Sequence, residues 1–599
     1  MCLVPGRPRG ITRMEMVHFV VWLSLCASLV LANSNCTRLF NSAVINNQTL
    51  YIDGGDMHTL LPNGSIPKSA IRDLQTVDLS RSWQNSDDDL FAYIRKPHDN
   101  SDTDDNPPWL NEGAAWSNGQ DLFFYGGYLS EKAGISVPPL ATWRYDIAAK
   151  NWTSRGFWGT PLVRLCQGGA VQSSVDQMAY YLGGSLNPAG NPTFINTPGA
   201  DVYMDPGLIA LDMNSLEWTN ASTADMNTWG TIGDGYVGLI DSVGKRGLLV
   251  AFGGYTYPVG QKLSFLAAQQ TKETNQNSME TVRVYDIDKQ RWYDQQTSGD
   301  VPHWRMAGCA VVAPAPDLSS YSIYVFGGMA AKTKDSDGNV YVLSVPSFRW
   351  IKVYDDHVLR YKHKCVLAQK HTMLAVGGII PVDDMEYYPQ SRNCDSSTFA
   401  NGIGIFDLRK LSWMSNYNAD DHGEYTIPSK IVDVIGGSET GGATLSKPQH
   451  GFNSSDLENL FKQRSVRPTA SVVANPTGSP SSSPKSTAGT GHTLSGGTIA
   501  GAVVGAVAGV ALLAGLIMAG VIVQRRRKEQ EAAHQDGPPW AKGASDTWMF
   551  APRPPEELDA APVYELSHDR QESWCGAASR VEMPTEANRT PELPASRDR

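Results

Sequence analysis

Six glycine pairs with the same surroundings constrain this chain of 599 residues more than any other feature. Each pair follows a short aromatic or aliphatic run, as residues 122–125 precede Gly126 and Gly127. A second apolar run then ends in Asp, or once in Ser, and a Trp follows five or six residues later. A pattern repeated in this way predicts one structural unit built several times over. The repeated residues are Gly54, Gly55 and Trp83; Gly126, Gly127 and Trp152; Gly183, Gly184 and Trp218; Gly253, Gly254 and Trp292; Gly327, Gly328 and Trp350; Gly377, Gly378 and Trp413.

The residues of each repeat suit a four-stranded β-sheet. Short runs of Tyr, Phe, Val, Ile and Leu favour strands. A glycine pair at the end of the second strand suits a positive φ angle or the close approach of another backbone. We expect the Trp to open the fourth strand and to bury its ring between neighbouring sheets, which removes about 150–250 Å² from water.

The order of these features resembles the repeats of the kelch family of β-propellers. Tyr145-Asp146 and Tyr285-Asp286 match the aromatic-Asp step of that family, and the resemblance covers about residues 36–445. It implies an all-β, kelch-like propeller of six blades, or of seven if residues 431–437 add a closing strand to the ring. The family's Arg or His before the first strand is mostly absent, and Arg305 is one match.

Two apolar segments outside the repeats predict secretion and a membrane anchor. Residues 19–31 follow a basic start and precede Ala32, which is the pattern of a cleaved signal peptide. Residues 499–523 carry no charge, and at ~1.5 Å per residue they are long enough as a helix to cross ~30 Å of hydrocarbon. The basic residues 525–528 follow directly, so the C-terminus should be cytoplasmic.

These segments define the domain organisation. The layout resembles fungal kelch proteins of the cell surface and wall, and it implies a plasma-membrane protein with its N-terminus outside. A short helix is expected near residues 456–463. The predicted parts are a signal peptide at 1–32, a propeller ectodomain at 33–450, a Ser/Thr/Pro/Gly-rich stalk at 451–496, a transmembrane helix at 497–523 and a disordered cytoplasmic tail at 524–599.

Secretion implies glycans and disulfides. The mature ectodomain has five cysteines, so at least one is free or pairs between molecules. We predict a disulfide between Cys365 and Cys394, within one repeat, worth roughly 3–4 kcal/mol in the chain-entropy model. The Asn-x-Ser/Thr acceptor sites are Asn35, Asn47, Asn63, Asn151, Asn220 and Asn453.

The long segments of the chain predict where a ligand binds. Residues 84–111, 185–207, 255–280 and 379–401 connect second to third strands or one repeat to the next, so they should gather on one face. Exposed aromatic side chains there could stack on sugars or anchor a protein, or they could pack the loops against the disc. The candidates are Trp109, Phe194, Tyr203, Tyr255, Tyr257, Tyr387 and Tyr388.

Further partners follow from the membrane span and the tail. Small residues at every fourth position let two transmembrane helices approach, which predicts a homodimer. The Pro-rich tail suits a cytoplasmic docking partner. The formal net charge of −11 and the absence of a long basic patch argue against nucleic acid. The small residues of the span are Gly497, Gly501, Gly505 and Gly509.

The sequence favours binding over catalysis. Kelch-like propellers include copper radical oxidases, but the Tyr-His dipeptide of their site is absent here. No metalloprotease, nucleophile-elbow or P-loop motif is present. We therefore predict a non-catalytic adhesion or recognition protein for glycan or protein ligands, without metal or cofactor. The alternatives are a copper-dependent oxidase or glycan-active enzyme, and a passive structural surface protein.

Overall fold

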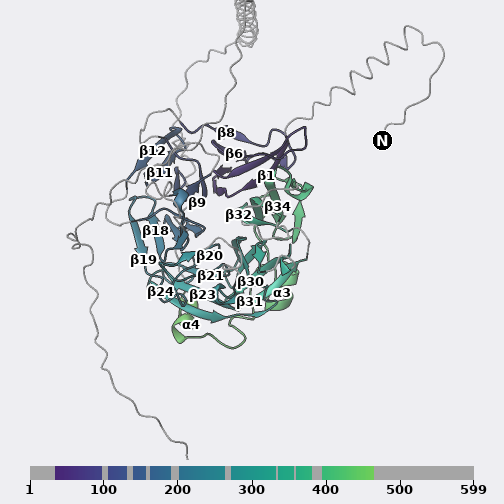
Figure 1. Ribbon diagram of the computed structural model, residues 1–599. Helices are drawn as coiled ribbons and strands as arrows, with labels where there is room; N and C mark the ends of the chain where they lie inside the picture. Colours follow the sequence, from purple (N-terminus) through teal and green to yellow (C-terminus); the bar gives the residue numbers. More distant parts are fainter. Residues whose placement is uncertain are drawn as a thin grey trace, which may run out of the picture. The chain divides into compact units, whose positions relative to one another are not determined.

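The computed structural model describes one β-rich body between residues 34 and 463 (Figure 1). The described ranges are 34–97, 106–130, 139–156, 162–190, 202–263, 272–331, 335–355, 359–380 and 394–463. The predicted signal peptide, membrane span and tail, and most of the stalk, lie outside them. Within the described ranges, no helix is long and apolar enough to cross a membrane.

In this body, six sets of four strands pair antiparallel in chain order, and further short strands extend two of these sets or pair among themselves. We number the six sets as blades 1 to 6. Blade 1 is β2 (Ser42–Asn46), β3 (Thr49–Asp53), β6 (Leu74–Asp78) and β8 (Ala92–Ile94); blade 2 is β9 (Leu110–Ser117), β10 (Asp121–Leu129), β11 (Thr142–Asp146) and β12 (Asn151–Arg155); blade 3 is β14 (Gly169–Ser173), β15 (Met178–Leu182), β18 (Leu208–Asp212) and β19 (Trp218–Ala221); blade 4 is β20 (Tyr236–Ile240), β21 (Leu248–Phe252), β23 (Thr281–Asp286) and β24 (Arg291–Gln296); blade 5 is β27 (Cys309–Pro314), β28 (Tyr321–Phe326), β30 (Val340–Val345) and β31 (Arg349–Tyr354); blade 6 is β32 (Tyr361–Ala368), β33 (Thr372–Ile379), β34 (Ile403–Asp407) and β35 (Ser412–Met414).

The first strands of the blades surround a common axis. Each of them contacts the first strand of the next blade, and β32 contacts β2, so the described sheets close into a ring (Figure 1). Hydrophobic clusters lie between successive blades; one of them joins β21, β23, β28 and β30. Radial packing of this kind is the architecture of a β-propeller and leaves only short strand edges exposed.

The glycine pairs have the conformation that the sequence predicts. All twelve glycines have positive φ angles. At Gly126, where φ is 76°, a Cβ atom would lie 2.3 Å from the carbonyl oxygen of Leu165, just before blade 3. The backbones of neighbouring blades therefore approach each other at a point where no side chain fits.

The repeated tryptophans lie in the fourth strands, with one exception. Trp152, Trp218, Trp292 and Trp350 are each at most 8% exposed, and Trp413 is half-buried in β35. Trp83 was predicted to open the fourth strand of blade 1, and this prediction is wrong. Trp83 instead lies in β7 (Trp83–Gln84), pairs with β36 (Asn416–Tyr417) and stacks on Tyr417 at 5.1 Å. This Trp therefore joins the first repeat to the end of the last.

The N-terminal strand also joins the two ends of the ring. β1 (Ser34–Leu39) pairs with β4 (Asp56–Leu60) of the first repeat and with β33 of blade 6. A disulfide between Cys36 and Cys394 links the same two regions. The short strand β5 (Lys68–Ala70) extends β4.

The predicted disulfide between Cys365 and Cys394 is wrong. Cys365 pairs with Cys309 across the first strands of blades 5 and 6. The reason is geometric: Cys365 lies on an innermost strand, whereas Cys394 lies in the segment leading to the third strand of its blade. The odd cysteine is Cys166, which is free and buried, as the count of five required.

The chain after blade 6 forms two helices. The predicted closing strand at residues 431–437 is wrong, because α3 (Ser429–Ile435) covers this segment and buries Ile431 and Ile435 one turn apart. Pro428 precedes the helix, and Gly436 ends it with φ of 74°. Burial of two residues four positions apart follows the spacing of a helix rather than of a strand.

The second helix corrects the start of the stalk. The predicted short helix is present as α4 (Ser455–Lys462), capped by the Ser454 hydroxyl, which accepts a hydrogen bond from the Leu457 N–H. Leu457 and Leu460 are buried against blades 4 and 5, and Phe461 packs at 5.7 Å from Phe348. Residues 451–463, assigned to the stalk, therefore belong to the folded body.

Short strands and turns cover the face where the glycine-bearing strands end, which we call the loop face. Strands from the connections of blades 3 and 4 pair there, as Val202 with Leu263. Asn85 also donates a hydrogen bond to the Ser397 carbonyl, which brings two more long segments together. The elements of this layer are β13 (Leu165–Cys166), β16 (Ser185–Leu186), β17 (Val202–Met204), β22 (Lys262–Leu263), β26 (Arg305–Met306), β29 (Met329–Ala330), η1 (Pro188–Gly190), η2 (Glu273–Asn275) and η4 (Ser397–Gly402). β25 (Ser298–Gly299) instead pairs in parallel with β31 and extends blade 5.

Three buried arginines lie at the start of first strands. Arg305 lies in β26 directly before blade 5, and Arg38 and Arg360 occupy the corresponding places before blades 1 and 6; each is 1% exposed. Arg305 binds both carboxylate oxygens of Asp337 at 2.9–3.0 Å. Arg360 binds Asp395 at 2.6 Å. The sequence identified Arg305 and missed the other two.

A pair of substitutions tests the close approach of the blades. Gly126→Ala places a methyl group against the Leu165 carbonyl, whereas Gly119→Ala, also at positive φ, meets nothing within 4 Å. We expect Gly119→Ala to lower the free energy of unfolding by about 1–3 kcal/mol through backbone strain. Gly126→Ala should cost at least twice as much in urea unfolding. Equal losses of unfolding free energy in the two variants would show that the blades have room for a side chain at Gly126.

Candidate functional site

Six residues with left-handed backbone conformation surround the axis at the loop face, one at or just before the start of each first strand. Their φ angles lie between 52° and 64°. Four hydrogen bonds of 2.6–2.7 Å run from the N–H of one to the carbonyl of the residue before it in the ring. We call them the axial ring: Phe40, Glu112, Gln167, Asp234, Ala307 and Lys362.

The axial ring was not identified from the sequence, although most of its members share a position directly before a glycine. Four of its members directly precede a glycine near the start of the first strand, as Glu112 precedes Gly113 and Asp234 precedes Gly235. Asn41 and His363 stand in the remaining two blades. The pattern is weak, because a single residue before glycine is common in turns.

A buried ion triad crosses the axial ring and joins blades 2, 4 and 6. The Lys362 ammonium lies 2.5 Å from Glu112 and 2.8 Å from Asp234, and each side chain is at most 8% exposed. Burial disfavours the charge of Lys362, but the two carboxylates outweigh it and raise the pKa of this lysine. Burial raises the pKa of Glu112 despite the ammonium beside it. The triad is therefore a fixed, water-poor contact across the axis.

A cavity extends from the triad along the axis between the first strands, and we call it the axial chamber. Small residues such as Ala43, Ala115 and Ala170 line much of it. Lys364 reaches both the chamber and the space beside the triad.

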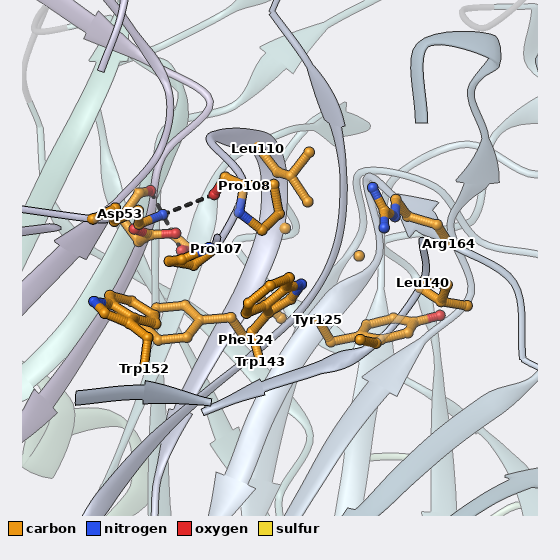
Figure 2. Close-up of a pocket in the computed structure, with 16 residues that line it drawn as sticks. Asp53, Pro107, Pro108, Leu110, Phe124, Tyr125, Leu140, Trp143, Trp152 and Arg164 are labelled. Atoms are coloured by element: carbon orange, nitrogen blue, oxygen red, sulfur yellow. Dashed lines mark hydrogen bonds and ion pairs between the residues drawn. The ribbon is translucent and has the colours of Figure 1, made fainter. Parts of the chain in front are cut away.

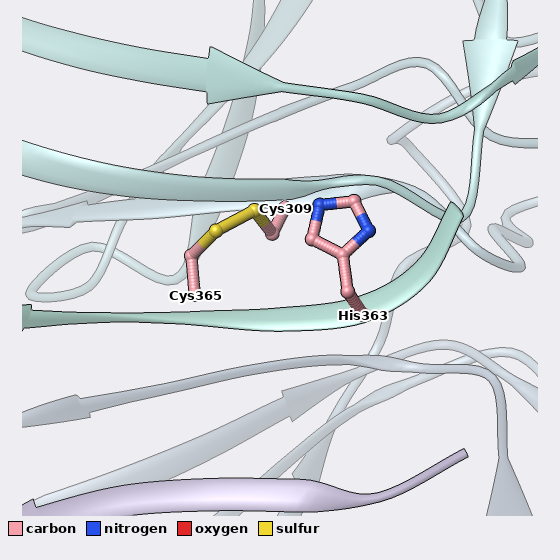
Figure 3. Close-up of side chains that lie close together, drawn as sticks. All are labelled: Cys309, His363 and Cys365. Atoms are coloured by element: carbon pink, nitrogen blue, oxygen red, sulfur yellow. A yellow bond between two sulfur atoms is a disulfide. The ribbon is translucent and has the colours of Figure 1, made fainter. Parts of the chain in front are cut away.

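Cys309, His363 and Cys365 gather beside the chamber and have the residue types of a metal site (Figure 3). The two sulfur atoms are joined as a disulfide, so neither is available as a thiolate ligand. Burial, Arg360 and Lys364 lower the pKa of His363 to about 3. The imidazole is therefore neutral at physiological pH and packs against Phe326 at 5.1 Å.

His371, Asp407 and Asp421 form a second group with suitable residue types. Arg409 contacts both carboxylates, and Lys410 lies 3.0 Å from Asp407. These cations already neutralise the acids, so the group is an ion-pair network on blade 6.

A pocket between blades 1 and 2 has aromatic walls (Figure 2). The Lys96 ammonium lies 2.6 Å from Asp53 and donates a hydrogen bond of 2.9 Å to the Pro108 carbonyl. It also lies 5.5 Å from the centre of the Trp152 ring and 5.9 Å from that of Phe124. Lys96 is only 5% exposed. The pocket is therefore occupied largely by a lysine that ties the first long segment to blade 1.

Two predicted ligand-binding aromatics are buried and cannot offer an open stacking surface. Trp109 is 4% exposed and packs under the Arg72 guanidinium at 4.8 Å. Tyr255 is fully buried, and its hydroxyl donates to Gln167 of the axial ring at 2.9 Å. For these residues the packing alternative is correct. Phe194, Tyr387 and Tyr388 lie outside the described residues.

The other two candidates, Tyr203 and Tyr257, are half-buried on the loop face, as are Trp229 and Trp304. Tyr203 pairs with Lys262 across β17 and β22. Tyr257 lies on the segment before β22, 6.4 Å from Trp229. Trp304 packs on the same buried cluster as Tyr257 and donates its indole N–H to the Gly254 carbonyl at 2.8 Å. We call Tyr203, Trp229, Tyr257 and Trp304 the aromatic patch.

Hydrogen bonds hold the backbone of this patch in place. The Tyr257 N–H donates to the Thr231 hydroxyl, which donates in turn to the Tyr257 carbonyl. The Trp229 N–H donates to the Asn227 side chain at 3.1 Å. The patch is therefore preorganised, which lowers the entropy lost on binding.

The six predicted glycosylation acceptors have exposed side chains. Asn35, Asn47, Asn63, Asn151, Asn220 and Asn453 are all accessible. Their modification remains a prediction.

Comparison with known proteins supports a kelch relationship. The chain is 27% identical over 462 residues to a kelch repeat-containing protein of Arthroderma benhamiae. The match covers 69% of this chain and 65% of the relative, so it spans slightly less than two thirds of that protein's length. No protein-family model matches the chain.

The pH dependence of stability tests the burial of His363. An unfolded His binds a proton below about pH 6.5, whereas folded His363 stays neutral down to about pH 3, so stability is lost as the pH falls between these values. We expect the free energy of unfolding to fall by about 1.4 kcal/mol per pH unit more in the wild type than in His363→Asn. Asn is chosen because Asn41 occupies the corresponding place in blade 1.

The control for this comparison is His303→Asn, at an exposed position. In this variant, the free energy of unfolding measured in urea should fall as steeply with pH as in the wild type, between about pH 6 and 4. If His363→Asn also keeps that slope, His363 titrates normally and is not buried as described.

Proposed function

We propose that this chain, which is similar to a kelch repeat-containing protein, is a kelch-like β-propeller that serves as a non-catalytic recognition protein of the cell surface. Its propeller would face outward on a stalk and a single membrane span, and would bind a glycan or a surface protein through the aromatic patch. The position of half-buried, backbone-anchored aromatic rings on the loop face is the observation that carries this proposal.

Aromatic rings of this kind suit both ligand classes. Tyr and Trp offer a large apolar face with few rotatable bonds, so they bury much area at low entropic cost. The indole of Trp304 is fixed by its hydrogen bond to Gly254, and the Tyr257 backbone is fixed on both sides by Thr231. Val259, 52% exposed on the same segment, extends the apolar surface of the patch.

The topology of the proposal rests on the sequence and on the exposed acceptor asparagines. The signal peptide and the basic run after residue 524 predict an external propeller and a cytoplasmic tail. The six exposed acceptor asparagines are compatible with passage through the secretory pathway. Dimerisation through Gly497, Gly501, Gly505 and Gly509, and docking of the Pro-rich tail, remain predictions on residues outside the described ranges.

A binding screen of the purified full-length chain against glycan and surface-protein arrays tests the proposal. We expect a saturable ligand whose affinity falls at least tenfold in Trp229→Ala/Tyr257→Ala, because each lost aromatic anchor typically costs about 1–3 kcal/mol. Tyr93→Ala is the matched control, since Tyr93 is 58% exposed on the outer strand of blade 1. Unfolding curves establish that both variants are folded.

Two results would contradict recognition through the aromatic patch. One is a ligand that Tyr93→Ala weakens as much as the double variant does. The other is a chain that binds nothing in the arrays and carries one tightly bound metal ion per molecule, which would indicate an enzyme.

A further inference from the structure

We propose that the axial chamber binds a small oxyanion through the ammonium group of Lys364. This site is separate from the aromatic patch and does not depend on what the patch recognises. The argument rests on the chamber's lining, on the partners of its charged groups and on the free edges of the first strands.

The chamber lining is neutral except at one residue. Glycines and alanines from five blades contribute much of the wall, and the Cys309–Cys365 disulfide lies in it. Lys364 is the charged side chain among the residues that line this cavity. An ammonium group facing a neutral cavity attracts an anion more strongly than one exposed to water, because the local dielectric is lower.

The neighbouring charges already have partners. Glu112 and Asp234 both contact the Lys362 ammonium within 2.9 Å. Across the described residues, by contrast, the Lys364 side chain has no carboxylate within ion-pair distance and no hydrogen bond, although its backbone pairs with Val376 in the sheet. Lys364 is half-buried. This burial and the nearby Lys362 ammonium lower its pKa, although Glu112 and Asp234 oppose the shift. Its positive charge therefore costs free energy that a bound anion would offset.

The backbone supplies further donors. Each first strand lies at the end of its sheet and pairs with a neighbour on only one side. Because the first strands contact one another around the axis, their unpaired edges face the chamber. N–H groups on these edges can donate hydrogen bonds to several oxygen atoms at once, which favours an oxyanion over a halide.

The chamber has room for such a ligand. The space open to the centre of a water-sized sphere is about 100 Å³, and one water molecule needs roughly 10–15 Å³ by the same measure. The chemistry fits either a phosphate or a carboxylate, and the two are distinguished by the probe used in the experiment.

The experiment titrates the full-length chain with inorganic phosphate, acetate and chloride at constant ionic strength and follows thermal unfolding. We expect phosphate, acetate or both to raise the melting temperature saturably, because a ligand that binds only the folded state stabilises it. Chloride should have a smaller effect. Lys364→Gln should raise the anion concentration that gives half of this stabilisation at least tenfold. Lys370→Gln, at an exposed lysine of the same blade that pairs with Glu424, should respond as the wild type does.

A second measurement keeps the proposal testable if Lys364→Gln does not fold. Amine acylation of the native wild-type chain is followed by mass spectrometry at Lys364 and Lys370. The effective anion should slow acylation of Lys364 at least tenfold and leave Lys370 unchanged. Equal protection of both lysines, no protection of Lys364, or an undiminished response in Lys364→Gln would overturn the proposal.

Discussion

The close approach of one blade's backbone to the next is the interaction on which the rest of the structure depends. In every repeat, the first glycine of the pair lies against the start of the following blade. The contact between Gly377 and Asn41 closes the series, because it joins blade 6 to blade 1. A side chain at these points would push neighbouring blades apart. The glycines therefore set the spacing around the axis, and with it the positions of the axial ring and the axial chamber.

The outer strands and the first strands of each blade are held together by different interactions. The buried tryptophans fill the space between the outer strands, while the axial ring links the first strands through backbone hydrogen bonds and one ion triad. A buried triad contributes specificity of arrangement more than net stability, because desolvation offsets much of the attraction between its charges. The long connections are then free to vary on the loop face. There they form a second layer of short strands that holds the aromatic patch in place.

The sequence predicted local features of the fold better than contacts between repeats. The conformation of the glycine pairs follows from the chemistry of glycine alone, and five of the six repeated Trp residues lie where the pattern places them. The pairing of Cys36 with Cys394 spans 358 residues and depends on ring closure, which no spacing reveals. Trp83 and the helix α3 were misassigned for a related reason, since both lie where the last repeat meets other parts of the chain.

The candidate site was predicted only in part. Tyr203 and Tyr257 share the aromatic patch, but Trp229 and Trp304 were missed because they lie on shorter connections that the argument from loop length did not include. Trp109 and Tyr255 are buried, and nothing in an isolated Trp or Tyr distinguishes an exposed platform from a packed loop. The charged members of the axial ring come from three blades, so only the closed fold brings them together.

Ring closure is the central claim of this account, and disulfide mapping of the non-reduced chain tests it most directly. Proteolysis followed by mass spectrometry should yield one peptide pair joined through Cys36 and Cys394 and another joined through Cys309 and Cys365. Cys166 should react with an alkylating reagent only after unfolding, because it is free and buried. A bond between Cys365 and Cys394, with Cys36 alkylated in the native chain, would contradict the closed ring and the chamber built on it.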